Sequence, residues 1–243
     1  DGENVLANRD KEVIARYPLH TLQSIVSFSY SGASPALMGK CAEAGIGLAF
    51  CSPRGRFLAR VCGGTGGNVL LRREQYRIAD DPVRCCEIAR TMIFGKLSNG
   101  ASSIQRTLRD HAPRVQDCGL ETAVANIRSL LPQILTVSDP DTLRGLEGVA
   151  ATAYFEVFDY MLLNRKEDFF FRGRSRRPPL DRVNAMLSFA YSLLAHDCAS
   201  ALESVGLDSY VGFLHRDRPG RQSLALDLME ELRPCMADRF VLT

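Results

Sequence analysis

The segment HRDRPGRQSLALDLMEEL, residues 215–232, combines residue types that bind divalent metal ions. His215 leads it, and in a helix Asp227 would share a face with Glu230 or with Glu231, three and four residues further on. Imidazole with carboxylates is a ligand set for a divalent ion, and the nitrogen favours Mn²⁺ or a similar transition ion somewhat more than an all-oxygen site would. A solvated acidic helix beside a loop histidine is the structural alternative, and spacing does not choose between the two glutamates.

A second candidate ligand is Glu147, in the stretch GLEGVAATAYF at residues 145–155. It lies among small residues on an otherwise apolar helix, so that another helix or a backbone can approach it closely. A buried carboxylate is costly without a cation, a hydrogen-bond donor or a proton. A metal ion would meet this need, and so would an arginine such as Arg144. Both interpretations stay open from this stretch alone.

A basic and aromatic region follows at residues 165–177, where six of thirteen residues are Lys or Arg and three are consecutive phenylalanines. Arginines bind phosphates through two hydrogen bonds at once, and aromatic rings stack on unpaired bases. A solvated loop is the alternative, and for the phenylalanines we favour packing in the core. With three more arginines after His215, a basic surface beside a metal site suggests phosphoryl transfer. The predicted DNA-binding residues are Arg165, Lys166, Arg172, Arg174, Arg176, Arg177, Arg216, Arg218 and Arg221.

The elements that position these residues differ between the two parts of the chain. Three short β-type runs are predicted at 25–28, 47–50 and 57–61, with a helix between Ser34 and Gly45. Beyond residue 80 the apolar spacing becomes helical, with a turn expected at Asn99-Gly100. The expected helices cover 82–97, 101–117, 119–135, 140–163, 181–204 and a segment that begins near 223.

These patterns predict an α+β fold in which a small N-terminal β-rich domain precedes a larger all-α domain. Four glycines within residues 63–67 favour a flexible junction, because no Gly-Lys-Ser/Thr sequence follows to make a phosphate-binding loop. The β-rich domain is placed at residues 1–64, the linker at 65–72 and the helical domain at 73–243.

Composition narrows the class of protein. The chain has 243 residues, of which 46% are hydrophobic, and its net charge of +2 does not by itself indicate a nucleic-acid partner. Eight cysteines without a CxxC pair favour reduced thiols in a cytoplasmic protein over zinc or disulfides. No apolar run approaches the length of about 20 residues that spans a membrane. The missing first methionine and the apolar, helix-like end suggest a fragment trimmed at both ends.

Taken in order, these stretches resemble the CRISPR adaptation integrase family, that of the first CRISPR-associated protein, and most of all its type I-C branch. The resemblance runs through nearly the whole chain. It rests on SGASPALM (31–38), RFLAR (56–60), LEG (146–148) with Tyr154-Phe155, RRPPLD (176–181), NAMLSFAY (184–191) and the region from Gly206-Leu207-Asp208 to Pro234.

The resemblance implies a divalent ion, Mg²⁺ or Mn²⁺, held by Glu147, His215 and Glu230, with Asp227 as a nearby acid that orients a ligand or a water. It thereby selects Glu230 over Glu231. It also implies a transesterification in which the 3′-hydroxyl of a short DNA, the spacer precursor, attacks a phosphodiester of a CRISPR repeat. The implied partners are both DNAs, a second copy of the chain as a homodimer, and a dimer of the second CRISPR-associated protein, with no membrane.

Two rival interpretations remain at this level. A nuclease acting on branched or single-stranded DNA would use the same ligands with water as the nucleophile. A non-catalytic DNA-binding or assembly module would show no metal dependence and no loss of function at Glu147. Tyr154 and Tyr191 are as consistent with packing as with catalysis, so neither is assigned a catalytic role.

Overall fold

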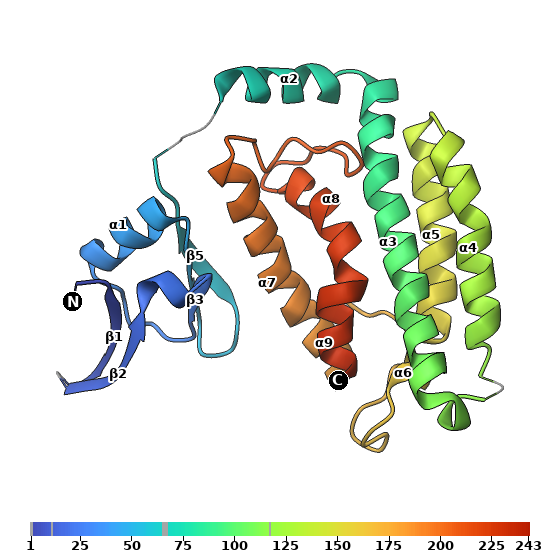
Figure 1. Cartoon of the computed structure of the whole chain (residues 1–243), viewed down its shortest axis with the longest axis horizontal. Helices are drawn as coiled ribbons and strands as arrows, with labels where there is room; N and C mark the ends of the chain where they lie inside the picture. The colour runs from blue at the N-terminus through green and yellow to red at the C-terminus, as the bar shows by residue number, and fades with distance from the viewer. Residues whose placement is uncertain (1, 11, 65–67, 117) are drawn as a thin grey trace. The chain divides into compact units, whose positions relative to one another are not determined.

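The computed structural model describes residues 2–10, 12–64, 68–116 and 118–243 (Figure 1). The chain forms two compact units, Asp1–Gly67 and Asn68–Thr243, which are described separately below. The first carries the strands and the second is helical, which confirms the expected α+β architecture. No helix in the described ranges is long and apolar enough to cross a membrane.

The first unit contains two small sheets. β1 and β2 form an antiparallel hairpin, while β3 pairs with β4 in parallel and β4 pairs with β5 in antiparallel. A parallel pair needs a crossover connection, and helix α1 supplies it between β3 and β4. The bounds are β1 Asn4–Arg9, β2 Glu12–Pro18, the 3₁₀ turn η1 Leu19–Thr21, β3 Ser24–Ser27, α1 Pro35–Ala44, β4 Gly47–Cys51 and β5 Phe57–Val61.

Helix α1 and strands β3 to β5 confirm the elements predicted in this unit. The Ser34 hydroxyl accepts a hydrogen bond from the Leu37 N–H, and Gly45 ends the helix with φ of 67°. The hairpin β1–β2 was not predicted as two strands. Six of the seven residues of β2 are exposed, so the strand lacks the apolar alternation that signals a half-buried strand.

The second unit is built around the long helix α3, which packs against α4 and α5 on one side and α8 on the other (Figure 1). Helix α7 packs against α8. The bounds are α2 Val69–Ala79, α3 Pro82–His111, η2 Ala112–Arg114, α4 Leu120–Thr136, α5 Pro140–Glu156, α6 Phe158–Met161, α7 Arg182–Ser204, α8 Ser223–Leu232, the π-helix η3 Arg233–Asp238 and α9 Arg239–Leu242.

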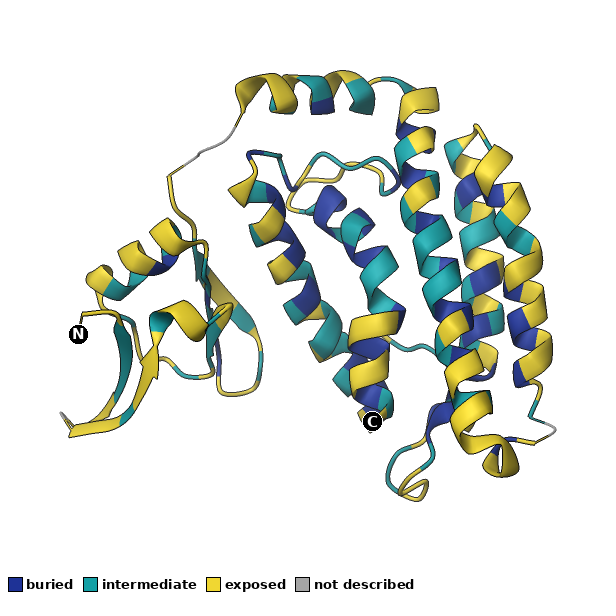
Figure 2. Ribbon diagram, in the orientation of Figure 1, coloured by how far each residue is buried: buried dark blue, intermediate teal, exposed yellow. Residues whose placement is uncertain are grey.

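Buried residues lie on the facing sides of these helices (Figure 2). The apolar ones among them form the core. Ile93 and Ile104 on α3 are fully buried, as are Ile127 on α4, Leu143 on α5 and Phe158 on α6. This core fixes α3 against α5, and a second apolar cluster, which includes Leu224 and Met229 of α8, packs against Met92 of α3. Helices α5 and α8 carry the acidic candidate ligands.

The turn predicted at Asn99-Gly100 is wrong, because α3 continues through both residues. Gly100 is buried where the Tyr154 ring approaches the backbone, and the Asn99 side-chain amide donates to the Glu231 carbonyl at 2.9 Å. Both residues therefore serve contacts between helices, although their types are typical of turns.

Residues 69–72, predicted as linker, begin helix α2 instead. The Asn68 side chain caps this helix by accepting from the Leu70 N–H, and Gln75 pins it by donating to the carbonyls of Asp208 and Val211. Residues 65–67 of the predicted linker lie outside the described residues. Residue 117, the last residue of the helix predicted at 101–117, does so too. The helix predicted for 140–163 is divided into α5 and α6.

Candidate functional site

Side chains from α3, α5 and α8 meet at the ammonium group of Lys96. This group forms an ion pair with Glu147 Oε1 from α5 and lies 2.6 Å from Glu230 Oε2 from α8. His215, in the loop before α8, directs Nε2 to within 3.9 Å of Glu230 Oε1. The structure thus brings together the three predicted ligands around a lysine that the sequence interpretation did not include.

Asp227 holds the histidine in place. Its side chain is fully buried, and Oδ1 lies 2.5 Å from His215 Nδ1 and accepts from the His215 backbone N–H at 2.9 Å. Oδ2 accepts from the backbone N–H groups of Phe213 and Leu214 at 2.6 and 2.9 Å. With Nδ1 as the donor to this carboxylate, Nε2 keeps its lone pair and can bind a metal ion. These contacts fix the position of the His215 ring.

Glu230 is the more deeply buried of the two acids that meet Lys96, with a side chain only 5% exposed. Burial alone would raise its pKa, but the positive charges of Lys96 and Arg233 outweigh burial and hold the pKa below its ordinary value. Arg233 Nη1 lies 3.0 Å from Glu230 Oε1. Glu231, the acid that spacing alone left open, instead packs against Gly95 of α3.

Glu147 has Lys96 as its ionic partner, so the arginine alternative is wrong. Arg144 pairs with Asp141 and donates through Nη1 to the Leu214 carbonyl at 2.7 Å. Arg144 therefore supports the loop that ends at His215 and does not neutralise Glu147.

These residues fit a divalent cation by their chemistry. Two carboxylates and a neutral imidazole suit Mg²⁺ or Mn²⁺. The buried Oε2 atom of Glu230 accepts no hydrogen bond among the described residues and has only the ion pair with Lys96. Within those residues, however, no three Asp, Glu, His or Cys side chains are arranged to hold an ion as they stand. Lys96 lies between the two carboxylates that a metal ion would need.

The predicted DNA-binding residues divide into exposed and partly buried groups. Arg174 is half-buried, where it donates to the Asn184 side chain at 2.8 Å and stacks over Tyr191, and Arg221 is also half-buried. Arg165, Lys166 and Arg216 are exposed but paired with nearby aspartates. The other exposed members are Arg172, Arg176, Arg177 and Arg218.

The consecutive phenylalanines only partly follow the prediction that they lie in the core. Phe171 is buried among the aromatic rings of the core, and Phe169 packs against it from a half-buried position. Phe170 is exposed instead, and the Arg172 guanidinium lies over its ring at 5.1 Å. One of the three rings therefore remains on the surface together with an arginine.

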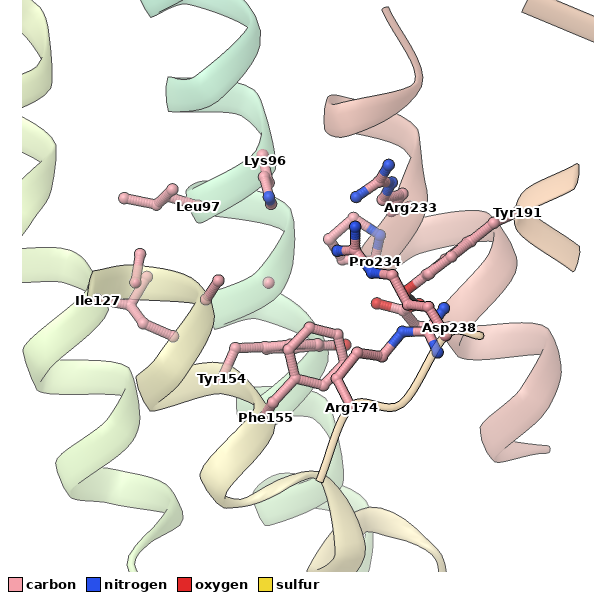
Figure 3. A pocket seen from close by; sticks show the side chains of 14 residues that line it. Lys96, Leu97, Ile127, Tyr154, Phe155, Arg174, Tyr191, Arg233, Pro234 and Asp238 are labelled. Carbon is pink, nitrogen blue, oxygen red and sulfur yellow. Dashed lines mark hydrogen bonds between the residues drawn. The ribbon is translucent and has the colours of Figure 1, made fainter. Parts of the chain in front are cut away.

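A cavity of about 40 Å³ adjoins the cluster and shares Lys96 and Arg233 with it (Figure 3). In the view, Arg233, Tyr191 and Asp238 face Tyr154 across the cavity. The Tyr191 hydroxyl lies 2.5 Å from Asp238 Oδ1. Burial raises the pKa of Asp238 to about 6, and the hydrogen bond from Tyr191 offsets it only in part. Both tyrosines pack in this network, where burial raises their pKa values well above the ordinary range.

We expect Asp238→Asn to remove a pH dependence from stability. A carboxyl whose pKa rises from 3.8 to about 6 on folding favours the folded state less as pH rises through this window. The wild type should lose about 2 kcal/mol of unfolding free energy from this group between roughly pH 4 and pH 6. Urea unfolding at both pH values would show a smaller decrease in the variant. Parallel pH profiles for the two proteins would contradict the raised pKa.

We also expect Gly212→Ala to destabilise the loop that carries His215. A Cβ atom there would lie 2.7 Å from Ser223 Cβ and 2.9 Å from Asp227 Oδ2. Relieving this overlap should cost about 1–3 kcal/mol of unfolding free energy in urea titrations. Gly145→Ala is the matched control, because its added Cβ meets nothing within 4 Å and helix propensity predicts equal or slightly higher stability. Equal stabilities for Gly212→Ala and wild type would show that the loop can shift freely.

Two carboxylates and an imidazole beside several cationic side chains are typical of an enzyme that acts on phosphodiesters. Comparison with known proteins identifies the family. The model of the CRISPR associated protein Cas1 family matches residues 1–243, and the chain belongs to this family. It is 50% identical to CRISPR-associated endonuclease Cas1 2 of Rhodospirillum rubrum and 46% identical to CRISPR-associated endonuclease Cas1 1 of Chlorobaculum tepidum. Each match covers the whole chain and 71% of the relative.

Solved structures agree with this assignment. A Cas1 protein from Thermotoga maritima has a TM-score of 0.77 at 20% identity, with 100% of this chain and 73% of that chain covered. A casposase bound to its integration product has a TM-score of 0.75 at 25% identity, with 100% and 68% covered. The chain is thus an enzyme of the Cas1 class of endonucleases and integrases, and this class generally requires a divalent metal ion.

Proposed function

We propose that this protein inserts short DNA segments into a CRISPR array by transesterification, with a divalent ion bound by Glu147, His215 and Glu230. The observation that carries the proposal is the convergence of these three side chains, in a chain of the Cas1 family, around one cationic group. Mg²⁺ and Mn²⁺ are the proposed ions, because both accept carboxylate oxygens and Mn²⁺ also accepts imidazole nitrogen readily.

The chain's own residues prepare the site for this reaction. Asp227 fixes the tautomer and orientation of His215, and Arg233 helps to keep Glu230 ionised. A bound divalent ion would polarise the phosphodiester and stabilise charge on the attacking or leaving oxygen. Asp227 remains a positioning residue in this proposal, because its oxygens are engaged by three backbone N–H groups and the imidazole.

DNA is proposed to lie over the exposed basic residues. Arg176 and Arg177 from the loop before α7, and Arg218 from the loop before α8, have exposed side chains with which to contact phosphates. Such contacts set the register of the DNA without selecting its sequence. Arg174 is proposed to act from within the cavity wall, since its guanidinium is held by Asn184 and Tyr191.

The proposed partners are the spacer precursor, the CRISPR repeat, a second copy of this chain and a dimer of the second CRISPR-associated protein. The resemblance of the sequence to CRISPR adaptation integrases supports this set. The placement in the type I-C branch rests on the same stretches of sequence and is part of the proposal.

An assay of DNA products tests the proposed reaction against its rivals. A labelled duplex with free 3′-hydroxyl ends would be incubated with a repeat-containing DNA, the second CRISPR-associated protein and Mn²⁺ or Mg²⁺. The proposal predicts metal-dependent products in which the label is joined to repeat DNA. Shortened strands alone would indicate hydrolysis by a nuclease. Bound DNA that stays chemically unchanged with either metal ion would indicate a binding or assembly module.

A further inference from the structure

Lys96 occupies an unusual position for a lysine on a helix that runs through the core. Its side chain is only 15% exposed, and its ammonium lies between carboxylates that come from two other helices. An isolated pair of buried carboxylates repels, so that one of them would tend to take up a proton. The ammonium group supplies the positive charge that lets Glu147 and Glu230 approach while both are ionised.

The two carboxylates that meet Lys96 are matched in charge by two nearby cations without a metal ion. Lys96 and Arg233 provide two positive charges, and Glu147 and Glu230 provide two negative ones. A divalent cation that enters between the carboxylates must therefore displace a group that already neutralises them. The group to be displaced is Lys96, since it alone of the two cations contacts both acids in the described structure.

The two cations also differ in how firmly they are fixed. The Arg233 guanidinium stacks on the Tyr191 ring at 4.9 Å from its centroid while it pairs with Glu230. Lys96 ends in a compact point charge on a flexible four-carbon chain, which can move to another rotamer when its acceptors are taken. Arg233 is thus held as part of the wall, whereas Lys96 can leave the gap.

We propose that Lys96 is a built-in counterion that closes the metal site in the absence of an ion and competes with the ion for Glu147 and Glu230. The inference rests on the proposed metal site and adds a residue that sets its affinity. Removing the competing charge should strengthen metal binding. It should also weaken the metal-free fold, because two carboxylates lose their shared cation.

Mn²⁺ titration followed by electron paramagnetic resonance tests this directly, because free Mn²⁺ is counted without reference to activity. Lys96→Met is expected to bind Mn²⁺ at least about tenfold more tightly than wild type, because close charges in a buried site interact strongly. Lys96→Arg keeps the charge and should stay near wild type. Lys40→Met is the matched control, because this exposed lysine lies on α1, in the first unit of the chain. It should leave the affinity unchanged.

Unfolding supplies a second readout. Without metal, Lys96→Met should melt below wild type, and saturating Mn²⁺ should raise its melting temperature more than that of wild type. Lys96→Gln, which keeps a hydrogen-bond donor between the carboxylates, takes its place if the methionine variant does not fold without metal.

The Mn²⁺ titrations distinguish failure of the Lys96 counterion from failure of the proposed metal site. In one outcome, wild type binds Mn²⁺, Glu147→Gln does not, and Lys96→Met binds Mn²⁺ no more tightly than wild type. This result would overturn the counterion role of Lys96 but would support the metal site. Binding absent from wild type but present in Lys96→Met supports strong competition. Binding absent from every protein, or undiminished in Glu147→Gln, overturns both the metal site and the inference.

Discussion

Replacing Glu147 by glutamine is expected to lower the rate of metal-dependent strand joining by about 1000-fold or more. The variant keeps the size of the side chain but replaces a charged ligand with a neutral amide, which binds a hard cation poorly. Metal ions contribute several kcal/mol to stabilising charge at a reacting phosphate, and each 1.36 kcal/mol is a factor of ten in rate. Single-turnover joining of labelled DNA at saturating Mn²⁺ would measure the loss.

Glu156→Gln is the matched control, because Glu156 lies on the same helix with an exposed side chain. It should join DNA at nearly the wild-type rate. Circular dichroism would establish that both variants keep their helices. A folded Glu147→Gln variant that joins DNA within threefold of wild type would exclude Glu147 as a metal ligand.

Replacing Asp227 by alanine should have the largest effect on stability among the candidate site residues. Its two oxygens accept hydrogen bonds from three backbone N–H groups in the loop before α8, and Oδ1 also faces His215. Without them, several buried or half-buried polar groups lose their acceptor, at an expected cost of about 3–5 kcal/mol. Urea unfolding would measure this loss.

The same change should weaken metal binding about 10- to 100-fold in protein that remains folded, because His215 loses the partner that fixes its tautomer. Glu231→Gln is the control on the same helix, since its carboxylate contacts neither His215 nor Lys96 among the described ion pairs. Glu231→Gln should change the unfolding free energy and the metal affinity little. An Asp227→Ala variant within 1 kcal/mol of wild type would show that the loop does not depend on this carboxylate.

Local signals predicted the elements that carry the ligands. Asp181 caps α7 by accepting from the Asn184 N–H, and α8 begins at Ser223, as its apolar spacing indicates. Helix α5 begins at Pro140, the first residue of the helix expected at 140–163, and the Asp139 side chain caps it. Each of these features is decided by neighbours in the sequence, so sequence alone contains it.

Lys96 was missed for the opposite reason. Its role depends on Glu147 and Glu230, which reach it from two other helices. The one available signal was a lone lysine on a helix that carries Ile93 and Leu97, both buried, and this pattern is equally typical of a lysine that reaches solvent. The turn predicted at Asn99-Gly100 was wrong for a similar reason. Contacts of these residues with α5 and α8 outweigh the turn preference of the pair.

The arginines of residues 165–177 show that clustering in the sequence does not predict which side chains are exposed. Clustering correctly indicated that Arg176 and Arg177 are exposed. It could not show that Arg174, two residues earlier, turns inward to Asn184 and Tyr191. Which member of a basic run meets solvent depends on how the loop packs against α7, and a single sequence does not contain that packing.

We propose that Glu147 and His215, from distant parts of the chain, bind one metal ion together. Pulsed electron paramagnetic resonance of Mn²⁺ bound to the protein tests it most directly, because a coordinated imidazole nitrogen couples to the electron spin of the ion. We expect nitrogen coupling in wild type, its loss in His215→Gln, and loss of bound Mn²⁺ in Glu147→Gln. Nitrogen coupling that persists in His215→Gln, or bound Mn²⁺ without such coupling in wild type, would contradict the proposed site.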